Sequence, residues 1–557
     1  MIRRICSVYF LLFILISTFS DAQTPSWIWA RQNSGAGQIR DTRIAVDDSD
    51  NLIVSGTFWN GTIVFGNDTA SGTYYDSFIA KYDPSGNVLW GRGVHGDGVE
   101  SILKICTDNS GNIYAAGNFN DSVLTVDSID IESRGGYNGF VIKYSPTGNV
   151  IWAKSIKGSS RYSLVNTYTI YSDGDNIFIG GTCYAELIDF GNLTVPADSN
   201  QSYGYVAKLD TSGECVWAKT FHGTYGGGST VRTMGITTDP SGNVIVIGDV
   251  YDPCFIFAND TLFNNIQRQN VVTLKYDAAG NEVWGKNFSG TGSYHNKSFG
   301  VTTDDFSNIY FIGSFQCDTL FLDSSEYLVN KGTLNSYITK MNSSGDLEWK
   351  FQIGGSSVDQ IFGVDWSPSG KIGISGSFNS DSIMFGNTLL QNFTQPPVND
   401  LYVAELDPLT GDVNWVIQAG GTSDDNGYDN VYDSNDNFNV VGISQSDPGV
   451  FGPDTLHCVS SYNVILAKLD LNSKANPDIN YDEVQIFPNP VSFLLNITTK
   501  QSVSEISITD VLGNIIYHKK FDNVKNPSVD VSEFKTGLYF VRLVTSAGNC
   551  NRRFIKL

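Results

Sequence analysis

Side chains with catalytic chemistry are few in this sequence and widely spaced. The five histidines lie far apart, and the chain has no G-x-S-x-G, H-E-x-x-H or Walker motif. Residues 91–96 match G-x-G-x-x-G. A dinucleotide site, however, also requires a helix that begins at the third glycine, and a strand-forming run follows here instead. We therefore predict no catalytic residue and no cofactor.

Binding chemistry is better represented, because aromatic and polar side chains gather in the variable segments that join successive repeats. Such groups on loops above a rigid scaffold are typical of recognition surfaces, and solvated loop residues without a function are the alternative. The candidate ligand-binding residues are Arg161, Tyr162, His222, Tyr225, Tyr294, His295 and Asp424.

Segments rich in Asp and Asn, such as Asp47–Asn51 and Asp173–Asn176, carry the oxygen ligands that Ca²⁺ prefers. None of them continues into a twelve-residue loop that ends in Glu. The same pattern recurs between strand-forming runs, and Asp, Asn and Gly are the residues that make tight turns. We interpret these segments as hairpin turns and predict no metal site.

The elements that must position these residues are seven copies of one unit. Each copy contains a run similar to Lys-Tyr-Asp-x-x-Gly-Asn-x-x-Trp, and consecutive copies lie 61 to 67 residues apart. A period of this length indicates stacked supersecondary units, each of which needs its neighbours to bury its apolar face. The tryptophans that close the runs are Trp29, Trp90, Trp152, Trp217, Trp284, Trp349 and Trp415.

Each unit contains four strand-forming runs, which in the second unit are residues 101–107, 112–119, 138–144 and 149–156. Val, Ile, Thr, Tyr and Phe are abundant, so the fold class is all-β. Four-stranded antiparallel units repeated radially make a β-propeller, with the connections between units on one face and the hairpin turns on the other.

The ends of the repeat array predict how it closes. The seventh unit ends after its third run, at residues 464–470, and no Trp-bearing fourth run follows. A run of that type, Trp27–Arg31, stands instead at the N-terminal end of the array. We expect residues 23–470 to form a seven-bladed propeller closed by this strand, because closure removes exposed sheet edges. An open solenoid is the alternative.

Two repeated residues have a structural interpretation. A Lys recurs on the third run of six units, at Lys81, Lys143, Lys208, Lys275, Lys340 and Lys468, whereas the sixth unit has Glu405 at this place. We expect this Lys to pair with a nearby carboxylate and the repeated Trp to pack between blades. Seven scattered cysteines follow residue 22, and we expect buried thiols, with one disulfide as the alternative.

Charge and the N-terminal segment indicate where the protein acts. Between residues 23 and 479 the chain has 24 basic and 50 acidic residues, a net charge of −26, which argues against nucleic acid as a partner. Residues 1–22 have two arginines, an apolar run at 8–19 and a small-x-small ending, the pattern of a signal peptide. We expect secretion; a single anchoring helix is the alternative. No stable membrane span is predicted.

The repeats resemble the SBBP repeats of bacterial secreted proteins. The resemblance covers about residues 27–470 and rests on the Lys-Tyr-Asp-x-x-Gly-Asn-x-x-Trp run. It implies a β-propeller and names no ligand.

Three short segments in the C-terminal part, residues 486–490 (Ile-Phe-Pro-Asn-Pro), 508–513 (Ile-Thr-Asp-Val-Leu-Gly) and 537–541 (Gly-Leu-Tyr-Phe-Val), follow one another in a distinctive order. With them this part of the chain resembles the type A C-terminal sorting domain of the type IX secretion system of Bacteroidota. The resemblance covers residues 482–557 and implies a small β-sandwich that is read by the secretion machinery, with the cargo released or attached to lipopolysaccharide. Residues 471–481 form a polar linker before it. The residues to which the resemblance assigns the sorting signal are Phe487, Pro488, Asn489, Pro490, Asp510, Gly513, Gly537, Leu538 and Tyr539.

Two functions fit these observations. The first is a secreted or cell-surface scaffold for binding or adhesion, with an extracellular glycan or protein as its ligand. The alternative is an extracellular hydrolase or lyase that uses one face of the propeller. An enzyme would have ionisable side chains clustered at the central channel, whereas a binding protein would present a broad aromatic and polar surface.

Overall fold

The computed structural model describes residues 25–471 and 484–557, apart from residues 36, 97, 121–122, 135, 198–200, 224–229, 253, 259, 264–268, 292–295, 459–461, 501, 510–514 and 546–547. The chain divides into two compact units, one of residues 25–471 and one that contains the described C-terminal residues. The predicted signal peptide (1–22) and most of the predicted linker (472–481) lie outside the described residues, as do Tyr225, Tyr294, His295, Asp510 and Gly513.

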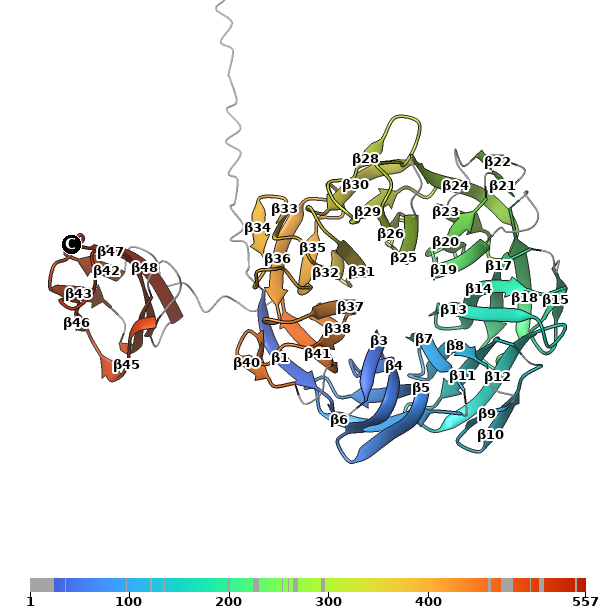
Figure 1. Ribbon diagram of the computed structural model, residues 1–557, viewed down its shortest axis with the longest axis horizontal. Coiled ribbons are helices and arrows are strands. Elements are labelled where there is room, and N and C mark those ends of the chain that lie inside the picture. The colour runs from blue at the N-terminus through green and yellow to red at the C-terminus, as the bar shows by residue number, and fades with distance from the viewer. Residues whose placement is uncertain are drawn as a thin grey trace, which may run out of the picture. The chain divides into compact units, whose positions relative to one another are not determined.

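Every regular element among the described residues is a β-strand, and each of the seven repeats contributes antiparallel strands to one sheet. In Figure 1 the first strands of the repeats lie innermost and the fourth strands lie outermost. The first strands are β3 (Gln38–Val46), β7 (Glu100–Thr107), β13 (Leu164–Ser172), β19 (Thr230–Thr238), β25 (Asn296–Thr303), β31 (Asp359–Trp366) and β37 (Asp425–Tyr432). The second strands are β4 (Leu52–Phe65), β8 (Ile113–Phe119), β14 (Asn176–Tyr184), β20 (Val244–Tyr251), β26 (Ile309–Phe315), β32 (Ile372–Phe378) and β38 (Phe438–Ser444).

The third and fourth strands complete each sheet. The third strands are β5 (Asp68–Tyr82), β11 (Asn138–Tyr144), β17 (Tyr203–Asp210), β23 (Gln269–Tyr276), β29 (Asn335–Met341), β35 (Asp400–Leu406) and β41 (Asn463–Asp470). The fourth strands are β6 (Val88–Val94), β12 (Val150–Gly158), β18 (Cys215–Phe221), β24 (Glu282–Gly290), β30 (Leu347–Ile353), β36 (Val413–Ala419) and, from the N-terminal end, β1 (Ser26–Gln32). Strand β1 pairs antiparallel with β41, from Ser26 opposite Asp470 to Gln32 opposite Ile465.

Extra hairpins lie between the second and third strands of the repeats. In the first repeat they are continuous with β4 and β5, which are correspondingly long. In the other repeats they are β9–β10 (Val123–Val126 and Ile129–Glu132), β15–β16 (Leu187–Asp189 and Thr194–Pro196), β21–β22 (Cys254–Phe257 and Asp260–Phe263), β27–β28 (Thr319–Phe321 and Tyr327–Val329), β33–β34 (Ser382–Phe385 and Thr388–Gln391) and β39–β40 (Gly449–Phe451 and Asp454–Leu456). A further short strand, β2 (Ser34–Gly35), pairs with β4.

The Asp-rich segments are turns, as predicted. Asp47 Oδ1 accepts hydrogen bonds from the backbone N–H of Ser49 (2.9 Å) and of Asn51 (3.0 Å), and the same pattern recurs at Asp108 and Asp239. The carboxylate thereby accepts hydrogen bonds from backbone N–H groups of the turn that have no partner on a neighbouring strand.

The repeated Trp packs against the next repeat, as predicted. The Trp90 indole N–H donates to the carbonyl of Pro146 (3.2 Å), and its ring lies on Gly148, whose φ of +82° is favourable only for glycine. A Cβ at Gly148 would lie 2.7 Å from the Trp90 ring, so both the turn and the contact require glycine. The equivalent pairs are Trp29–Gly86, Trp152–Gly213, Trp217–Gly280, Trp284–Gly345 and Trp349–Gly411.

The repeated Lys pairs with the first Asp of the turn in its own repeat at four of the six positions. Lys340 pairs with Glu348 instead (2.8 Å), so the predicted carboxylate partner is confirmed at five. Burial by itself would raise the pKa of Asp239, but hydrogen bonds from Asn243 and Lys275 outweigh it and lower that pKa. In the sixth repeat both partners are replaced, the Asp by Ser367 and the Lys by Glu405. The ion pairs are Lys81–Asp47 (2.6 Å), Lys143–Asp108 (3.6 Å), Lys275–Asp239 (2.9 Å) and Lys468–Asp433 (2.7 Å).

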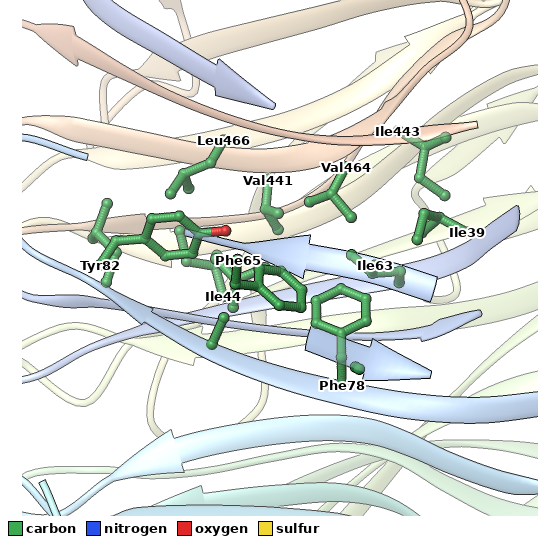
Figure 2. Close-up of a cluster of buried hydrophobic side chains, with 14 of the residues drawn as sticks. Ile39, Ile44, Ile63, Phe65, Phe78, Tyr82, Val441, Ile443, Val464 and Leu466 are labelled. Carbon is green, nitrogen blue, oxygen red and sulfur yellow. The ribbon is translucent and has the colours of Figure 1, made fainter. Parts of the chain in front are cut away.

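The first and last repeats share one apolar core. Figure 2 shows Ile39 and Ile44 of β3 with Val441 of β38 and Val464 of β41, all of them buried or nearly so. Trp29 of β1 belongs to the same cluster. Segments from the two ends of the repeat array are therefore held together by the hydrophobic effect as well as by the β1–β41 strand pairing.

The six cysteines whose side chains are described, at positions 106, 183, 215, 254, 317 and 458, are all free thiols. Burial raises the pKa of Cys183 and Cys317 to about 12, so both stay protonated at neutral pH. The interpretation of these residues as thiols rather than half-cystines is confirmed within the described part of the chain.

The C-terminal unit consists of two sheets that share an apolar core. One contains β42 (Val484–Phe487), β43 (Leu494–Thr499) and β46 (Ser528–Asp530); the other contains β44 (Val503–Thr509), β45 (Ile515–Val524), β47 (Gly537–Thr545) and β48 (Gly548–Lys556). Of the predicted sorting residues, Phe487, Pro488, Asn489 and Pro490 form an exposed segment. Gly537, Leu538 and Tyr539 lie on β47, where the buried Tyr539 ring stacks on Phe554 with 5.6 Å between ring centroids.

Candidate functional site

A channel of about 470 Å³ runs between the seven first strands of the repeats. Strands β3, β7, β13, β19, β25, β31 and β37 all contribute residues to its wall. Figure 1 shows these strands around a common centre. A cavity of this volume lies within the range that small-molecule sites occupy. The channel is therefore the largest candidate site that all seven repeats build together.

Each first strand contains a β-bulge at the same place, a few residues from its beginning. A bulge leaves one residue without a cross-strand partner and redirects its side chain. Six of these residues line the channel, and we call them the bulge girdle. The unpaired residues are Arg40, Leu103, Tyr168, Met234, Phe299, Phe362 and Tyr428, and the girdle comprises all of them except Arg40.

Three of the four aromatic members of the girdle form a continuous arc over the fifth to seventh repeats. The ring centroids of Phe299 and Phe362 are 5.7 Å apart, and those of Phe362 and Tyr428 are 5.1 Å apart. All three rings are only partly buried. Arg40 behaves differently, since its guanidinium lies over the Tyr75 ring at 6.0 Å. The arc is a preformed apolar surface that faces the channel.

Charged groups gather in the channel wall beside the arc, in the first, second and seventh repeats. Lys104 Nζ lies 2.6 Å from Asp429 Oδ2, an ion pair that joins the second repeat to the seventh across the first. The Ile44 N–H of the first repeat also points to Asp429 Oδ2, at 3.4 Å. The Arg43 guanidinium donates to the carbonyl of Leu103 at 3.0 Å. Three repeats are thereby connected by polar contacts within the channel wall.

Asp365 is a carboxyl group of the channel wall with a strongly raised pKa. Burial raises its pKa to about 7, with the negative charge of Asp429 adding to the effect, while the hydrogen bond from the Tyr432 N–H (2.8 Å) and the positive charge of Lys104 oppose it. A carboxyl group with a pKa near 7 can donate or accept a proton at neutral pH.

The raised pKa of Asp365 predicts how replacement by Asn changes stability. Between about pH 4, where an unfolded Asp ionises, and about pH 7 the folded state binds the proton more tightly than the unfolded state. Ionisation of Asp365 therefore lowers the stability of the wild type as the pH rises through this range. We expect Asp365→Asn to match the wild type at pH 4 and to be more stable at pH 8, measured by urea unfolding. The same difference at both pH values would contradict the shift.

The described members of the sequence-predicted binding set lie in three separate connections. Tyr162 is 74% exposed, and the Arg161 guanidinium lies 4.7 Å from its ring centroid. His222 packs against Tyr203, with ring centroids 4.7 Å apart, and its Nδ1 lies 3.3 Å from Gln201 Nε2. These side chains remain accessible for binding.

Asp424 has a different position from the exposed loop residue that the sequence suggested. It is partly buried, and its Oδ1 accepts a hydrogen bond from the Asn399 N–H (2.9 Å). Its backbone carbonyl accepts a second one from the Gln445 N–H (2.9 Å). Asp424 therefore ties the start of the last sheet to the preceding repeat, a structural contact that comes from segments distant in sequence.

Sequence reasoning missed the bulge girdle. The signal is nevertheless present as one large residue at the same place in the first strands, as in Thr-Tyr-Thr at 167–169, Ser-Phe-Gly at 298–300 and Gly-Tyr-Asp at 427–429. Simple alternation assigns these residues to one face of a strand, and only the bulge turns them into the channel.

Metal-binding clusters and membrane-spanning helices are both absent from the described part of the chain. In the described ranges, no group of three or more His, Cys, Asp or Glu side chains is placed to hold a metal ion. Across the same residues, no helix has the length and apolarity needed to cross a membrane.

Comparison with known proteins gives one family match and several distant similarities. The chain is 25% identical over 415 residues to the uncharacterized WD repeat-containing protein L264 of Acanthamoeba polyphaga mimivirus; the match covers 62% of this chain and 30% of that protein. The structure is similar to PorZ, a surface component of the type IX secretion system of Porphyromonas gingivalis, with 10% identity, coverage of 92% and 81%, and a TM-score of 0.28. It is also similar to the quinohemoprotein alcohol dehydrogenase of Comamonas testosteroni, with 9% identity, coverage of 83% and 79%, and a TM-score of 0.38.

The family match concerns the C-terminal unit. Residues 485–557 match the family described as the secretion system C-terminal sorting domain, which agrees with the two-sheet unit formed there. The chain therefore carries a sorting domain that the type IX secretion machinery recognises, and the protein is exported to the cell surface or secreted.

Proposed function

We propose that this protein is a binding or adhesion scaffold that acts at the cell surface or after release. The observation that carries the proposal is the bulge girdle, because six large side chains that could be buried between sheets instead face a channel. Partly exposed aromatic rings on a rigid framework gain free energy when a ligand covers them. Export by the sorting domain brings this surface into contact with extracellular ligands.

The architecture within this proposal is a closed seven-bladed propeller made of SBBP-type repeats. Three observations support closure: β1 pairs with β41, Trp29 packs on Gly86 as the other tryptophans pack on their glycines, and Lys468 donates to the Pro84 carbonyl (3.4 Å) as Lys81 does to Pro146 (3.1 Å). The last sheet thus contacts the first repeat in the way that each repeat contacts the next.

The domain division within the proposal is a signal peptide at 1–22, the propeller at 23–470, a linker at 471–481 and the sorting domain at 482–557 of a protein from the Bacteroidota. The described residues support a division near residue 471, where the two compact units separate.

Ligand recognition uses the channel end that is close to the connections between repeats. The bulges lie near the beginnings of the first strands, and each first strand follows one of these connections. The accessible side chains of Tyr162 and His222 lie in the same set of connections. The girdle and the connections can therefore contact one ligand together.

The test is a screen of extracellular glycans and surface proteins against the purified mature chain, followed by substitution of the girdle. We expect Phe362→Ala with Tyr428→Ala to weaken binding of the ligand found by roughly tenfold or more, because both rings lose contact area. Phe306→Ala is the matched control, because this exposed Phe lies on a hairpin turn outside the channel and the connections. Unchanged affinity in the girdle variant together with a loss in Tyr162→Ala would place recognition on the connections instead.

A second function is favoured by one observation, the cluster of Asp365, Asp429 and Lys104 in the channel. An extracellular hydrolase or lyase could use Asp365 as a proton donor or acceptor at neutral pH. Incubation with polysaccharides and measurement of released reducing ends tests this function. Activity in the wild type that Asp365→Asn abolishes supports it, and activity that survives this substitution contradicts a role for Asp365.

A further inference from the structure

Two hollows flank the beginning of β19. The first, of about 350 Å³, lies between the third and fourth repeats, and the second, of about 140 Å³, lies on the side of the fifth repeat. Thr230 and Arg232 line both hollows. Tyr168 lines the first hollow and the channel, so the larger hollow adjoins the bulge girdle.

Among the described residues that line these hollows, Arg232 is the one cation. Its side chain is exposed, and it makes no hydrogen bond or ion pair with the residues that the structure describes. The nearby Asp249 is already occupied: it accepts hydrogen bonds from Gln269 Nε2 (2.8 Å) and from the N–H and Oγ of Ser298 (both 2.9 Å). The five N–H donors of the Arg232 guanidinium are thus available for a carboxylate, which they match in geometry.

The rest of the larger hollow combines neutral polar, aromatic and apolar side chains. Asn166 and Gln201 offer amide groups, and Tyr168 and Tyr184 offer ring faces with hydroxyl groups. His222 contacts Gln201 at the border of this hollow, and the exposed Leu164 adds an apolar face. Such a mixed wall suits a sugar ring, which has apolar C–H faces and hydroxyl groups at its edges.

We propose that this site binds a sugar unit that carries a carboxylate, a hexuronic acid residue of an extracellular saccharide, with Arg232 as the partner of the carboxylate. The neutral polar groups of the larger hollow hold the hydroxyl groups, and Tyr168 extends the site toward the channel. The negative charge of the repeat unit repels polyanions. Salt screens this repulsion beyond roughly 8 Å at physiological ionic strength, whereas Arg232 would contact the carboxylate directly, so the local attraction outweighs it. The assignment rests on the proposed binding function and specifies its ligand.

Isothermal titration of the mature full-length chain tests the assignment with trigalacturonate, a trimer of a hexuronic acid, as the probe and maltotriose as its neutral counterpart. We expect trigalacturonate to bind at least roughly tenfold more tightly than maltotriose, since a charge-assisted hydrogen bond contributes more than a neutral one. Arg232→Met should remove this preference, and Arg232→Lys should restore part of it. Arg134→Met, which removes an exposed Arg that pairs with Asp189 away from both hollows, is the matched control and should keep the preference.

Several results would overturn the assignment. They are equal affinity for the two trisaccharides, no binding of trigalacturonate, and a preference that survives Arg232→Met while the melting temperature of the variant is unchanged. Tighter binding of a glutamate-rich peptide than of trigalacturonate would assign the site to acidic peptides instead. If Arg232 has no effect but Phe362→Ala with Tyr428→Ala abolishes binding of a ligand from the screen, the proposed binding function stands and the saccharide assignment fails.

Discussion

Replacing Trp29 by Ala should lower the free energy of unfolding of the repeat unit by ~3–5 kcal/mol, the cost of removing a large buried aromatic side chain. Trp29 is 6% exposed and packs in the core shared by the first and last repeats, against Gly86 of the first repeat. The loss is large because the indole joins the two ends of the array, where no covalent connection supports the contact. Chemical denaturation followed by tryptophan fluorescence and circular dichroism measures it.

The matched control is Ile28→Ala, one residue earlier on the same strand. Ile28 is 45% exposed and has no cross-strand partner, because it is the extra residue of a β-bulge, so its replacement should cost less than about 1 kcal/mol. Similar small losses for both variants would mean that β1 does not close the ring through Trp29. A stable, fully folded protein after deletion of residues 26–32 would contradict closure more directly.

Deletion of residues 482–557 should abolish delivery to the cell surface and leave the repeat unit folded. The family match covers 485–557, and this segment forms its own two-sheet core of residues such as Ile497, Ile508 and Val541. The repeat unit has separate cores, so it should keep its stability without the tail. Fractionation and surface protease accessibility should show the truncated chain inside the outer membrane, with little or none outside.

A point variant distinguishes loss of the signal from loss of the tail. Phe554 is fully buried and stacks on Tyr539, so Phe554→Ala should unfold the tail and reduce delivery strongly. Lys520→Ala changes an exposed side chain of β45 and should leave delivery unchanged. Normal delivery of the chain without residues 482–557 would refute the role of the sorting domain in export.

The sequence by itself determined the repeat unit and the tail. The turn residues and the recurring Lys and Trp keep the same role in most repeats, and these roles are local or concern adjacent repeats. Asp47 binds the backbone of its own turn, and Trp90 contacts the turn of the following repeat. Short-range patterns of this kind can be read along the chain, because alternation and turn chemistry act over a few residues.

The sites depended on the tertiary structure, because they combine residues that the sequence separates. Lys104 and Asp429 are 325 residues apart and meet only because the first and last repeats are neighbours around the channel. The girdle depends on bulges, which shift the register by one residue and reverse the face on which a side chain lies. Arg232 stands out among the exposed arginines because a hollow lies on either side of it and because the neighbouring Asp249 accepts its hydrogen bonds from other residues. The sequence predicts Asp424 to be a ligand-binding loop residue, but in the structure its carboxylate accepts a hydrogen bond from the Asn399 N–H. Period and turn chemistry therefore determine the scaffold, whereas the spatial convergence of distant repeats determines which side chains remain available to a ligand.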